Sequence, residues 1–522
     1  MDFVLLCKIE KSFFNKRKGM RMMKMGKLLA LFLALLMLLG TLVACGGDPA
    51  ETEGKGSTTR PSAGEDEVQD TVPADLRFDG ETVTFLIRDN KDQYKYELAC
   101  EDLLNNPLYD AIHYRNIDVE TRLGLKFKTV GQNGSYTNFS KWNEVLSTSV
   151  LTNTGDFDGA AFYLSTGSAL AKDGIYYNLL SLTDYEGGYL NFEKPWWNQT
   201  LVDELAAYST LFFAGGSLTI SEVDDGACIF FNRDLFNQLY PEDRDTALYQ
   251  LVRDGKWTAD KMASYVSGAW TDMNSNGAID DGDVVGTRIH AIGKSAGIMD
   301  AWVVAMGLRL TETNVYGEPE IALLNSNILP AYEKVRSIFG NNPGALLVAE
   351  MSGETDLKNG NMLFKTATFH HGVEMKESVV NYGVLPIPKL DQEQAEYYTG
   401  FGNEASAVAI CSNLDDDRAI MVSAVLELLS AEGYKQVIPV YYGTILKGHY
   451  SREQADAEMY DKILGSFVFS FGFAYSSQSL GGIGSIFRDL SPTFDMQNHI
   501  DSNKETWNTK LTELLTALEA VS

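Results

Sequence analysis

Oxygen-bearing side chains recur at regular intervals in the acidic stretch Asp272–Asp283, which reads DMNSNGAIDDGD. Counted as a twelve-residue loop, it has side-chain oxygens at positions one, three, five, nine and twelve, and Gly277 at position six. This pattern is typical of a calcium-binding loop, in which the glycine allows a sharp turn and the seventh residue adds a backbone carbonyl. The candidate calcium ligands are Asp272, Asn274, Asn276, Ala278, Asp280 and Asp283.

Two features separate this loop from a paired EF-hand. Position twelve is Asp283 where an EF-hand has glutamate, and the shorter side chain reaches less far for bidentate binding. The residues that follow, Val284–His290, resemble a strand and not a second helix. Aspartate at position twelve resembles dockerin-type loops, although a dockerin carries two of them. We expect a structural calcium site and no functional cofactor; the alternative is an acidic Asn/Gly turn.

A second chemical feature is a thiol at the end of an apolar run. Leu28–Cys45 reads LLALFLALLMLLGTLVAC and follows a cluster of lysines and arginines, which is typical of an export signal. Its last four residues resemble a bacterial lipobox, which implies that Cys45 receives a diacylglycerol thioether and becomes the first mature residue. The alternative is a membrane-spanning anchor, but the run is shorter than the roughly 20 residues a span needs.

The charge of the chain excludes several classes of partner. The net charge is −28 over 522 residues, and residues 1–44 carry +6, so the remainder carries −34. Such acidity argues against nucleic acid, whose phosphates require Lys and Arg, and against docking on anionic lipid beyond the anchor itself. The remaining cysteines, Cys100, Cys228 and Cys411, have no metal-ligand or disulfide-framework spacing and are interpreted as buried small side chains.

The chain after Cys45 divides into a tether and an ordered body. Residues 46–75 are rich in Gly, Ser, Thr, Pro and Glu and bury too little apolar surface to fold. Strand patterns then alternate with helical ones, which predicts an α/β fold with mostly parallel sheets. The expected strands are 82–87, 125–130 and 157–163, and the expected helices between them are 108–123 and 142–151.

Several motifs in sequence order resemble one family. Phe231–Phe236 reads FNRDLF and is followed by Trp257-Thr258, and Tyr382–Pro388 reads YGVLPIP. With the lipobox and tether, this set resembles the extracellular solute-binding proteins of ABC importers, in the sugar-binding group that includes maltose-binding protein. The resemblance runs from about Phe78 to Ala520.

The resemblance implies two α/β lobes joined by two or three crossing segments, with ligand trapped between them by hinge closure. It implies a monomer on the outer face of a bacterial cell membrane, held there by lipid alone, that delivers a carbohydrate to ABC permease subunits. We expect residues 1–44 to be the signal peptide, with 1–19 an over-extended start, and residues 45–76 to be the lipidated cysteine and the tether. The N-terminal lobe is expected to consist of 77–220 and 382–430, and the C-terminal lobe of 221–381 and 431–522.

Aromatic and acidic residues near the expected cleft are the candidate ligand contacts, because sugars stack C–H faces on rings and present hydroxyls to polar groups. We expect one of Trp196 and Trp197 to face the cleft and the other to be core. Trp302 and Tyr475 are weaker candidates that fit the core better. The full set is Tyr163, Trp196, Trp197, Asp224, Asp225, Trp302, Phe369, His370, His371 and Tyr475.

An enzyme is the main rival class. A surface lipoprotein glycoside hydrolase would need two carboxylates at a fixed separation in a cleft, and no motif marks such a pair among the many acidic residues. No serine-hydrolase, zinc-protease or phosphate-loop motif is present in the sequence. A third class is a non-transport carbohydrate-binding or adhesion protein. We therefore expect a binding protein and not an enzyme.

The lipobox predicts that Cys45→Ser leaves the precursor unlipidated, so that the protein either stays uncut or is released into the medium. Membrane fractionation and mass spectrometry of the N-terminal peptide measure this outcome. Unchanged membrane retention, with no lipid mass on residue 45 of the unaltered protein, would contradict it.

The acidic loop predicts that calcium raises the melting temperature. A ligand in hundredfold excess over its Kd stabilises the folded state by about 2.7 kcal/mol. Asp272→Ala is expected to abolish the shift. If a chelator leaves the melting curve of the native protein unmoved, the loop is only a turn.

Overall fold

In the computed structural model, residues 69–206, 209–291, 297–325, 327–350, 353–401 and 404–521 are described. The signal sequence, Cys45 and most of the expected tether lie outside the described residues. The described residues belong to one compact unit. Among the described residues, no helix has the length and apolar character that crossing a bilayer requires.

The first of two large sheets has the strand order β11-β3-β1-β2. Strands β1 (Thr82–Arg88), β2 (Lys126–Gln132) and β3 (Gly159–Tyr163) are parallel, and β11 (Ser406–Ile410) is antiparallel to β3. The helices between them are α2 (Asp92–Tyr96), α3 (Pro107–Leu123) and α4 (Phe139–Leu151). We call this sheet and the elements packed on it the first lobe.

Local sequence explains these boundaries. The side chain of Asn106 accepts the backbone N–H groups of Leu108 and Tyr109 and so caps the start of α3. Gly124 ends α3 in the left-handed region, at φ 65°, where a Cβ is unfavourable. The first residue of β3, Gly159, has to be glycine because a Cβ there would lie 2.4 Å from the Phe85 ring of the neighbouring strand. The predicted order of strand and helix is thus confirmed in this lobe.

The second large sheet has the order β10-β4-β9-β5-β8. It contains β4 (Ala227–Asn232), β5 (Val285–His290), β8 (Ala345–Val348), β9 (Met362–Thr368) and β10 (Tyr382–Leu385). Strand β5 is parallel to β8 and β9, whereas β4 is antiparallel to both β9 and β10. We call this sheet and its helices the second lobe. These are α8 (Arg233–Leu239), α9 (Arg244–Arg253), α10 (Ala259–Ser267), α12 (Ile328–Phe339), α13 (Gly372–Glu377) and α15 (Gln454–Leu464).

Two expectations about this sheet are wrong. Strand β10 was expected to begin the return to the first lobe at Tyr382, but it pairs with β4, and the return to the first lobe comes between β10 and β11. The sheet is also more mixed than predicted, since two of its four pairings are antiparallel. A strand's own sequence shows that it is buried, but not which sheet it joins or in which direction.

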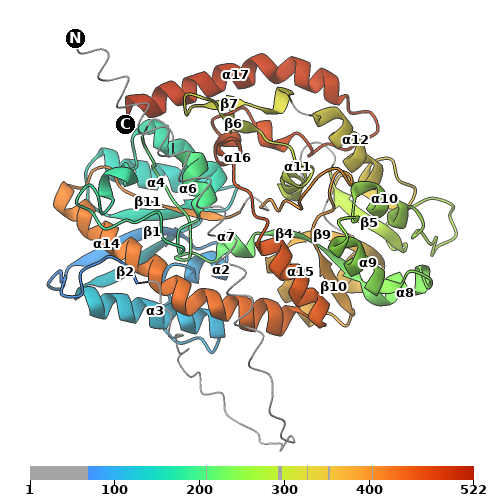
Figure 1. The fold of residues 1–522 in the computed structure, drawn as a ribbon, viewed down its shortest axis with the longest axis horizontal. Helices are drawn as coiled ribbons and strands as arrows, with labels where there is room; N and C mark the ends of the chain where they lie inside the picture. Colours follow the sequence, from blue (N-terminus) through green and yellow to red (C-terminus); the bar gives the residue numbers. More distant parts are fainter. Residues whose placement is uncertain are drawn as a thin grey trace, which may run out of the picture. The chain divides into compact units, whose positions relative to one another are not determined.

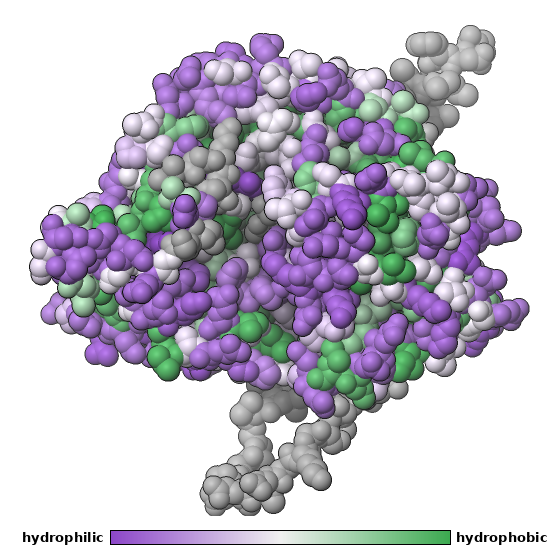
Figure 2. Space-filling model, turned by 180° about the vertical axis from the view of Figure 1, so that it is seen from behind, coloured by the Kyte–Doolittle hydropathy of each residue, from purple (hydrophilic) through white to green (hydrophobic). Residues whose placement is uncertain are grey.

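Three segments cross between the lobes (Figure 1). The first ends in the short helix α7 (Ser221–Asp224) just before β4, and the second joins β10 to β11. The third continues α14 (Asp416–Glu432) through the π-helical segments Gly433–Val437 and Val440–Tyr450 to α15. The rear face of the body is mostly hydrophilic, with apolar residues in separate patches (Figure 2).

The remaining elements are short or C-terminal. Helices α5 (Leu164–Gly167) and α6 (Gln199–Leu205) and the 3-10 turns η2 (Ser168–Asp173) and η3 (Leu179–Leu182) belong to the first lobe. Helix α11 (Asp300–Ala305) precedes a small hairpin of β6 (Thr311–Thr313) and β7 (Pro319–Ile321). The chain ends with α16 (Phe471–Ser476), the turn η10 (Ile483–Ser485) and α17 (Met496–Ala520).

A buried carboxylate organises the core beside α14. The side chain of Glu427 is fully buried, and it accepts the indole N–H of Trp196 at 3.0 Å and that of Trp197 at 2.8 Å. The backbone N–H of Asn191 adds a third bond at 3.0 Å. Both indoles therefore point inward, and both rings are at most 2 % exposed. The expectation that one of them faces a cleft is wrong, because these residues lie in a turn, where adjacent side chains need not point in opposite directions.

This arrangement predicts that the free energy of unfolding depends on pH through Glu427. Burial raises the pKa of Glu427 from its ordinary 4.5 to about 7, against the opposing effect of its three donors. A carboxyl whose pKa is higher in the folded state stabilises that state fully below about pH 4.5, and this stabilisation is lost as the pH rises to 7. We expect the free energy of unfolding of the unaltered protein, minus that of Glu427→Gln, to fall by about 3 kcal/mol between these pH values.

Urea unfolding at pH 4.5, 6 and 7.5 measures this difference. Glu505→Gln, at an exposed carboxylate on α17, is the matched control and is expected to leave the pH profile unchanged. A difference for Glu427→Gln that is flat, or that grows with pH, would contradict the assignment.

Candidate functional site

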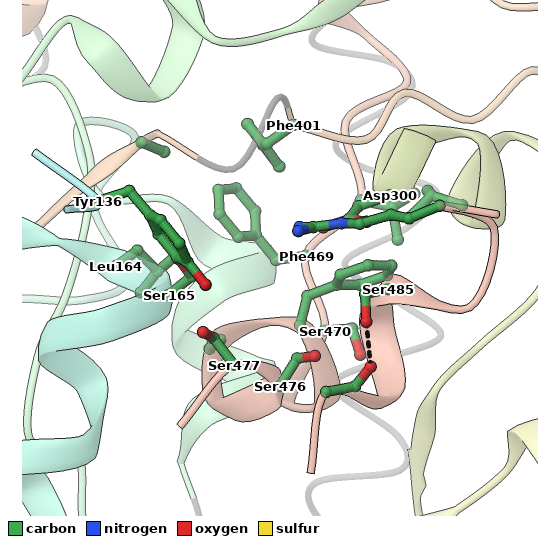
Figure 3. A pocket seen from close by; sticks show the side chains of 17 residues that line it. Tyr136, Leu164, Ser165, Asp300, Phe401, Phe469, Ser470, Ser476, Ser477 and Ser485 are labelled. Carbon is green, nitrogen blue, oxygen red and sulfur yellow. Dashed lines mark hydrogen bonds and ion pairs between the residues drawn. The ribbon is translucent and has the colours of Figure 1, made fainter. Parts of the chain in front are cut away.

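A pocket of about 180 Å³, partly open to solvent, lies where elements of both lobes meet the C-terminal segment. Its walls come from β-strand ends and loops of the first lobe, from α11, from the second crossing segment and above all from residues 468–488 (Figure 3). The lining residues are Tyr136, Leu164, Ser165, Asp300, Val304, Phe401, Ala405, Val468, Phe469, Ser470, Phe473, Ala474, Ser476, Ser477, Gly482, Ser485 and Arg488.

Aromatic rings form one part of the wall. The Phe401 and Phe469 rings lie 4.1 Å apart between centroids at an interplanar angle of 34°, and Phe467 supports Phe401 at 5.1 Å. Tyr136 is 55 % exposed and reaches the pocket from the loop after β2. Its ring packs edge-on against Tyr163 at 6.5 Å. The pocket therefore offers ring faces on which an apolar ligand surface can stack.

Serine hydroxyls form a second part, on and after α16. The Ser476 hydroxyl accepts the backbone N–H of Gly484 at 2.7 Å, and the Ser485 hydroxyl donates to the carbonyl of Gly482 at 2.7 Å. Ser470 caps α16 by accepting the N–H of Gly472 at 3.1 Å. These bonds orient the hydroxyls, and each oxygen keeps further hydrogen-bonding capacity for a ligand. Figure 3 shows Ser470, Ser476, Ser477 and Ser485 together on one side of the pocket.

One ion pair borders the pocket. The Arg488 Nε donates to Asp300 Oδ1 at 2.7 Å, and its Nη2 bonds the second carboxylate oxygen. Burial acts to lower the pKa of Arg488, but the bonds to Asp300 outweigh it and the pKa is raised. Bidentate pairing of this kind holds both side chains in one geometry. Figure 3 shows Asp300 across the pocket from Tyr136.

The carboxylates at the first crossing lie behind the pocket wall. Asp225 accepts the backbone N–H of Glu404 at 2.6 Å and of Ala405, a lining residue, at 3.1 Å. Burial raises the pKa of Asp225 well above its usual value. Asp224 accepts the hydroxyl of Tyr441 at 2.6 Å and bonds His370 at 3.0 Å. The two carboxylates predicted to accept ligand hydroxyls are thus bonded to protein donors.

The other predicted contacts divide between the pocket's surroundings and the core. Tyr163 is buried directly beside the lining residues Leu164 and Ser165, with the Arg88 guanidinium 5.2 Å from its ring. None of the ten predicted ligand residues lines the pocket itself. Trp196, Trp197, Trp302, Phe369 and Tyr475 are buried at 3 % exposure or less. The expectation that Trp302 and Tyr475 fit the core better than the site agrees with this burial.

The histidine pair lies at the start of α13, away from the lining residues. His371 bonds the Thr368 hydroxyl at 3.1 Å, and burial lowers its pKa to about 4. Among the described residues no group of three or more His, Cys, Asp or Glu side chains is placed to hold a metal ion. Within the acidic loop, Asp272 accepts backbone N–H groups of its own turn, and Asp283 accepts the Trp270 indole N–H at 3.0 Å. The calcium site stays a prediction.

Sequence reasoning missed the residues that build most of the pocket. Residues 475–485 form a Gly- and Ser-rich stretch near the C-terminus, without a motif. The usable signal was compositional: aromatic residues alternate with small ones through residues 469–475, and two serines follow, which places hydroxyls beside rings. Phe401 and Asp300 carried no signal, because only the fold brings them to the same place.

No protein-family model and no curated protein sequence matches this chain. Solved structures do match its fold. A cyclo/maltodextrin-binding protein complexed with maltotetraose aligns over 84 % of this chain and 97 % of its own, at 10 % identity and a TM-score of 0.50. A Listeria monocytogenes ABC substrate-binding protein in complex with cycloalternan aligns over 85 % and 98 %, at 13 % identity and a TM-score of 0.48.

A family 1 extracellular solute-binding protein from Bifidobacterium longum subsp. infantis aligns over 85 % of this chain and 99 % of its own, at 12 % identity and a TM-score of 0.47. The fold assignment rests on the cyclo/maltodextrin-binding protein and on the two mixed sheets with their crossing segments. The predicted resemblance is confirmed at the level of the fold, which this chain shares with the cyclo/maltodextrin-binding protein.

Proposed function

We propose that this protein captures a carbohydrate in the pocket between its lobes and delivers it to the permease of an ABC importer. The observation that carries the proposal is the composition of that pocket, in which aromatic ring faces lie beside a row of oriented serine hydroxyls. A sugar presents the complementary surface, since its C–H faces stack on rings while its hydroxyls donate and accept hydrogen bonds.

The dimensions and charge of the pocket agree with such a ligand. The pocket, with a volume of about 180 Å³, is partly open to solvent, so a ligand larger than the pocket can extend out of it. Arg488 and Asp300 carry opposite charges and form one ion pair, so together they add no net charge to the pocket. Proteins of the same fold are described as complexes with maltotetraose and cycloalternan, which gives the class of ligand to test first.

The pocket does not favour the rival glycoside hydrolase. Retaining and inverting enzymes both use two carboxyl groups, separated by roughly 5–9.5 Å, on either side of the bond they cleave. Asp300 supplies the single carboxylate among the lining residues, and it is bonded to Arg488. The proteins of this fold compared above are binding proteins. We therefore infer capture without turnover.

The remaining parts of the proposal concern location and partners. The lipobox-like sequence ending at Cys45 supports a lipid anchor on the outer face of the cell membrane, and the polar stretch that follows supports a flexible tether. The acidic loop at Asp272 is proposed as a calcium clip that stabilises the second lobe. The chain is proposed to act as a monomer, with permease subunits as its protein partners.

Replacing the exposed pocket ring tests the proposal. Tyr136→Ala is expected to weaken binding by on the order of 2 kcal/mol, or roughly thirtyfold in Kd, by analogy with aromatic hot spots. Mass spectrometry of small molecules that co-purify with the protein identifies the ligand. Titration calorimetry with maltotetraose and raffinose measures the binding of each variant. Reaction products are assayed in the same mixtures, and sugar cleavage would favour the hydrolase instead.

Tyr316→Ala is the matched control. Tyr316 is 84 % exposed in the turn between β6 and β7 and does not line the pocket. Both variants remove an exposed tyrosine, so neither is expected to cost much folding stability. Equal binding by the two variants would show that Tyr136 does not contact the ligand. The proposed function would be contradicted if no tested sugar bound and no sugar co-purified with the protein.

A further inference from the structure

The last helix of the chain contacts both lobes. Helix α17 is 25 residues long, which corresponds to about 37 Å at 1.5 Å per residue. It packs on α12 and β7 toward one end and on η2 of the first lobe toward the other. In Figure 1 it runs along the top of the body, whereas α14 and α15, which belong to the third crossing, run along the bottom.

The segment before α17 is attached firmly to the second lobe. The hydroxyl of Tyr332 on α12 donates to the carbonyl of Asp489 at 2.8 Å, and its ring lies 5.8 Å from Phe487 and 6.0 Å from Phe494. The backbone N–H of Leu490 donates to the carbonyl of Ala291 at 2.9 Å, just after β5. The Arg488–Asp300 ion pair adds a further contact.

The far end of α17 rests on the first lobe. Its buried face consists of Met496, Ile500, Trp507, Leu511, Leu514 and Leu518. A Cβ built on Gly174, which ends η2, would lie 3.8 Å from the Cβ of Val521 at the end of the helix. Leu518 and Val521 have apolar side chains, so their part of this contact is side-chain packing.

Helix α17 also lies against the pocket wall. A Cβ on Gly481 would lie 3.5 Å from the Trp507 ring, and Gly481 directly precedes the lining residue Gly482. On the other side of the same wall, the Ser168 hydroxyl of η2 donates to the carbonyl of Ala474 at 2.6 Å. The C-terminal segment therefore joins the pocket, α12 and η2 into one continuous set of contacts.

A hinge motion about the crossing segments would change the distance between η2 and α12. A single helix seated on both cannot follow such a motion without leaving one of them. The attachment before α17 includes two hydrogen bonds to the second lobe and an ion pair to α11, whereas apolar side chains pack on η2 at the far end. We propose that α17 is a strap that holds the lobes in the arrangement seen here, and that they can move apart about the crossing segments only when the end of α17 leaves η2.

The strap is independent of the ligand's identity, so its test needs no ligand. Nitroxide labels are placed on Leu151→Cys in the first lobe and Val379→Cys in the second, where the native side chains are 73 % and 101 % exposed. The native Cys100, Cys228 and Cys411 are buried and are not expected to react, and Cys7 and Cys45 are replaced by serine in every labelled protein. Pulsed electron paramagnetic resonance is expected to give one narrow distance distribution for the full chain.

Leu518→Asp, which places a charge in the contact with η2, is expected to add a population at longer distances. Thr516→Asp adds the same charge to an exposed position of the same helix and is expected to leave the distribution unchanged. A broad distribution in the unaltered chain, or identical distributions for the two variants, would overturn the proposal.

A covalent lock tests the same contact in the opposite direction and without labels. The Cβ separation at Gly174 and Val521 is 3.8 Å, within the range of about 3.5–4.5 Å that a disulfide needs. In Gly174→Cys/Val521→Cys, oxidation is expected to slow amide hydrogen exchange across residues 464–488 relative to the same protein after reduction. The single Gly174→Cys variant controls for strain at that residue, whose φ is 70°.

Equal exchange in the oxidised and reduced proteins would overturn the strap. So would failure of the disulfide to form under oxidant, because the end of α17 would then not rest on η2. Neither outcome depends on sugar binding, so failure of the strap and failure of the proposed function are distinguished.

Discussion

The carboxylate of Asp225 links the first crossing segment to the second. It receives the backbone N–H groups of Glu404 and Ala405, and Arg88 of β1 donates to the carbonyl of Glu404 at 2.8 Å. Removing a carboxylate from water is costly, and backbone donors with a nearby guanidinium offset part of that cost. Because β11 begins at Ser406, the bond also determines where the return strand enters the first sheet.

The pocket depends on this junction. Phe401 and Ala405 belong to the segment that Asp225 holds, and Phe401 in turn supports Phe469. Glu404 receives Lys91 at 2.6 Å and the hydroxyl of Tyr94, which ties the same segment to the end of β1. The acidic residues near the expected cleft therefore shape the pocket through the backbone that they position, and they do not themselves line it.

The C-terminal segment completes the site from the outside. Residues 468–488 supply more of the pocket wall than either sheet does, and α17 lies against them. In a two-lobed binding protein the ligand commonly acts as the contact between lobes. Here part of that contact belongs to the chain itself, through apolar side chains of α17 on η2 and through Tyr332 and Arg488 on the second lobe.

The sequence by itself determined the elements whose signals are local. The apolar run 82–87 and the alternation in 125–130 predicted β1 and β2, and Gly124 marked the end of α3, because these signals depend on neighbouring residues alone. The structure adds the Asn106 cap of α3 and the Asn232 cap of α8, which accepts the N–H of Leu235. The two-lobed fold was predicted from the family resemblance that the motifs carry.

Only the tertiary structure decided which side chains form the site. Trp196 and Trp197 looked like stacking rings, but Glu427, more than 200 residues later, draws both indoles into the core. Tyr136, Phe401 and Phe469 meet in space although hundreds of residues separate the first from the last. Whether a ring faces a ligand or the core depends on partners that are remote in sequence, and a single chain's pattern carries no record of those contacts.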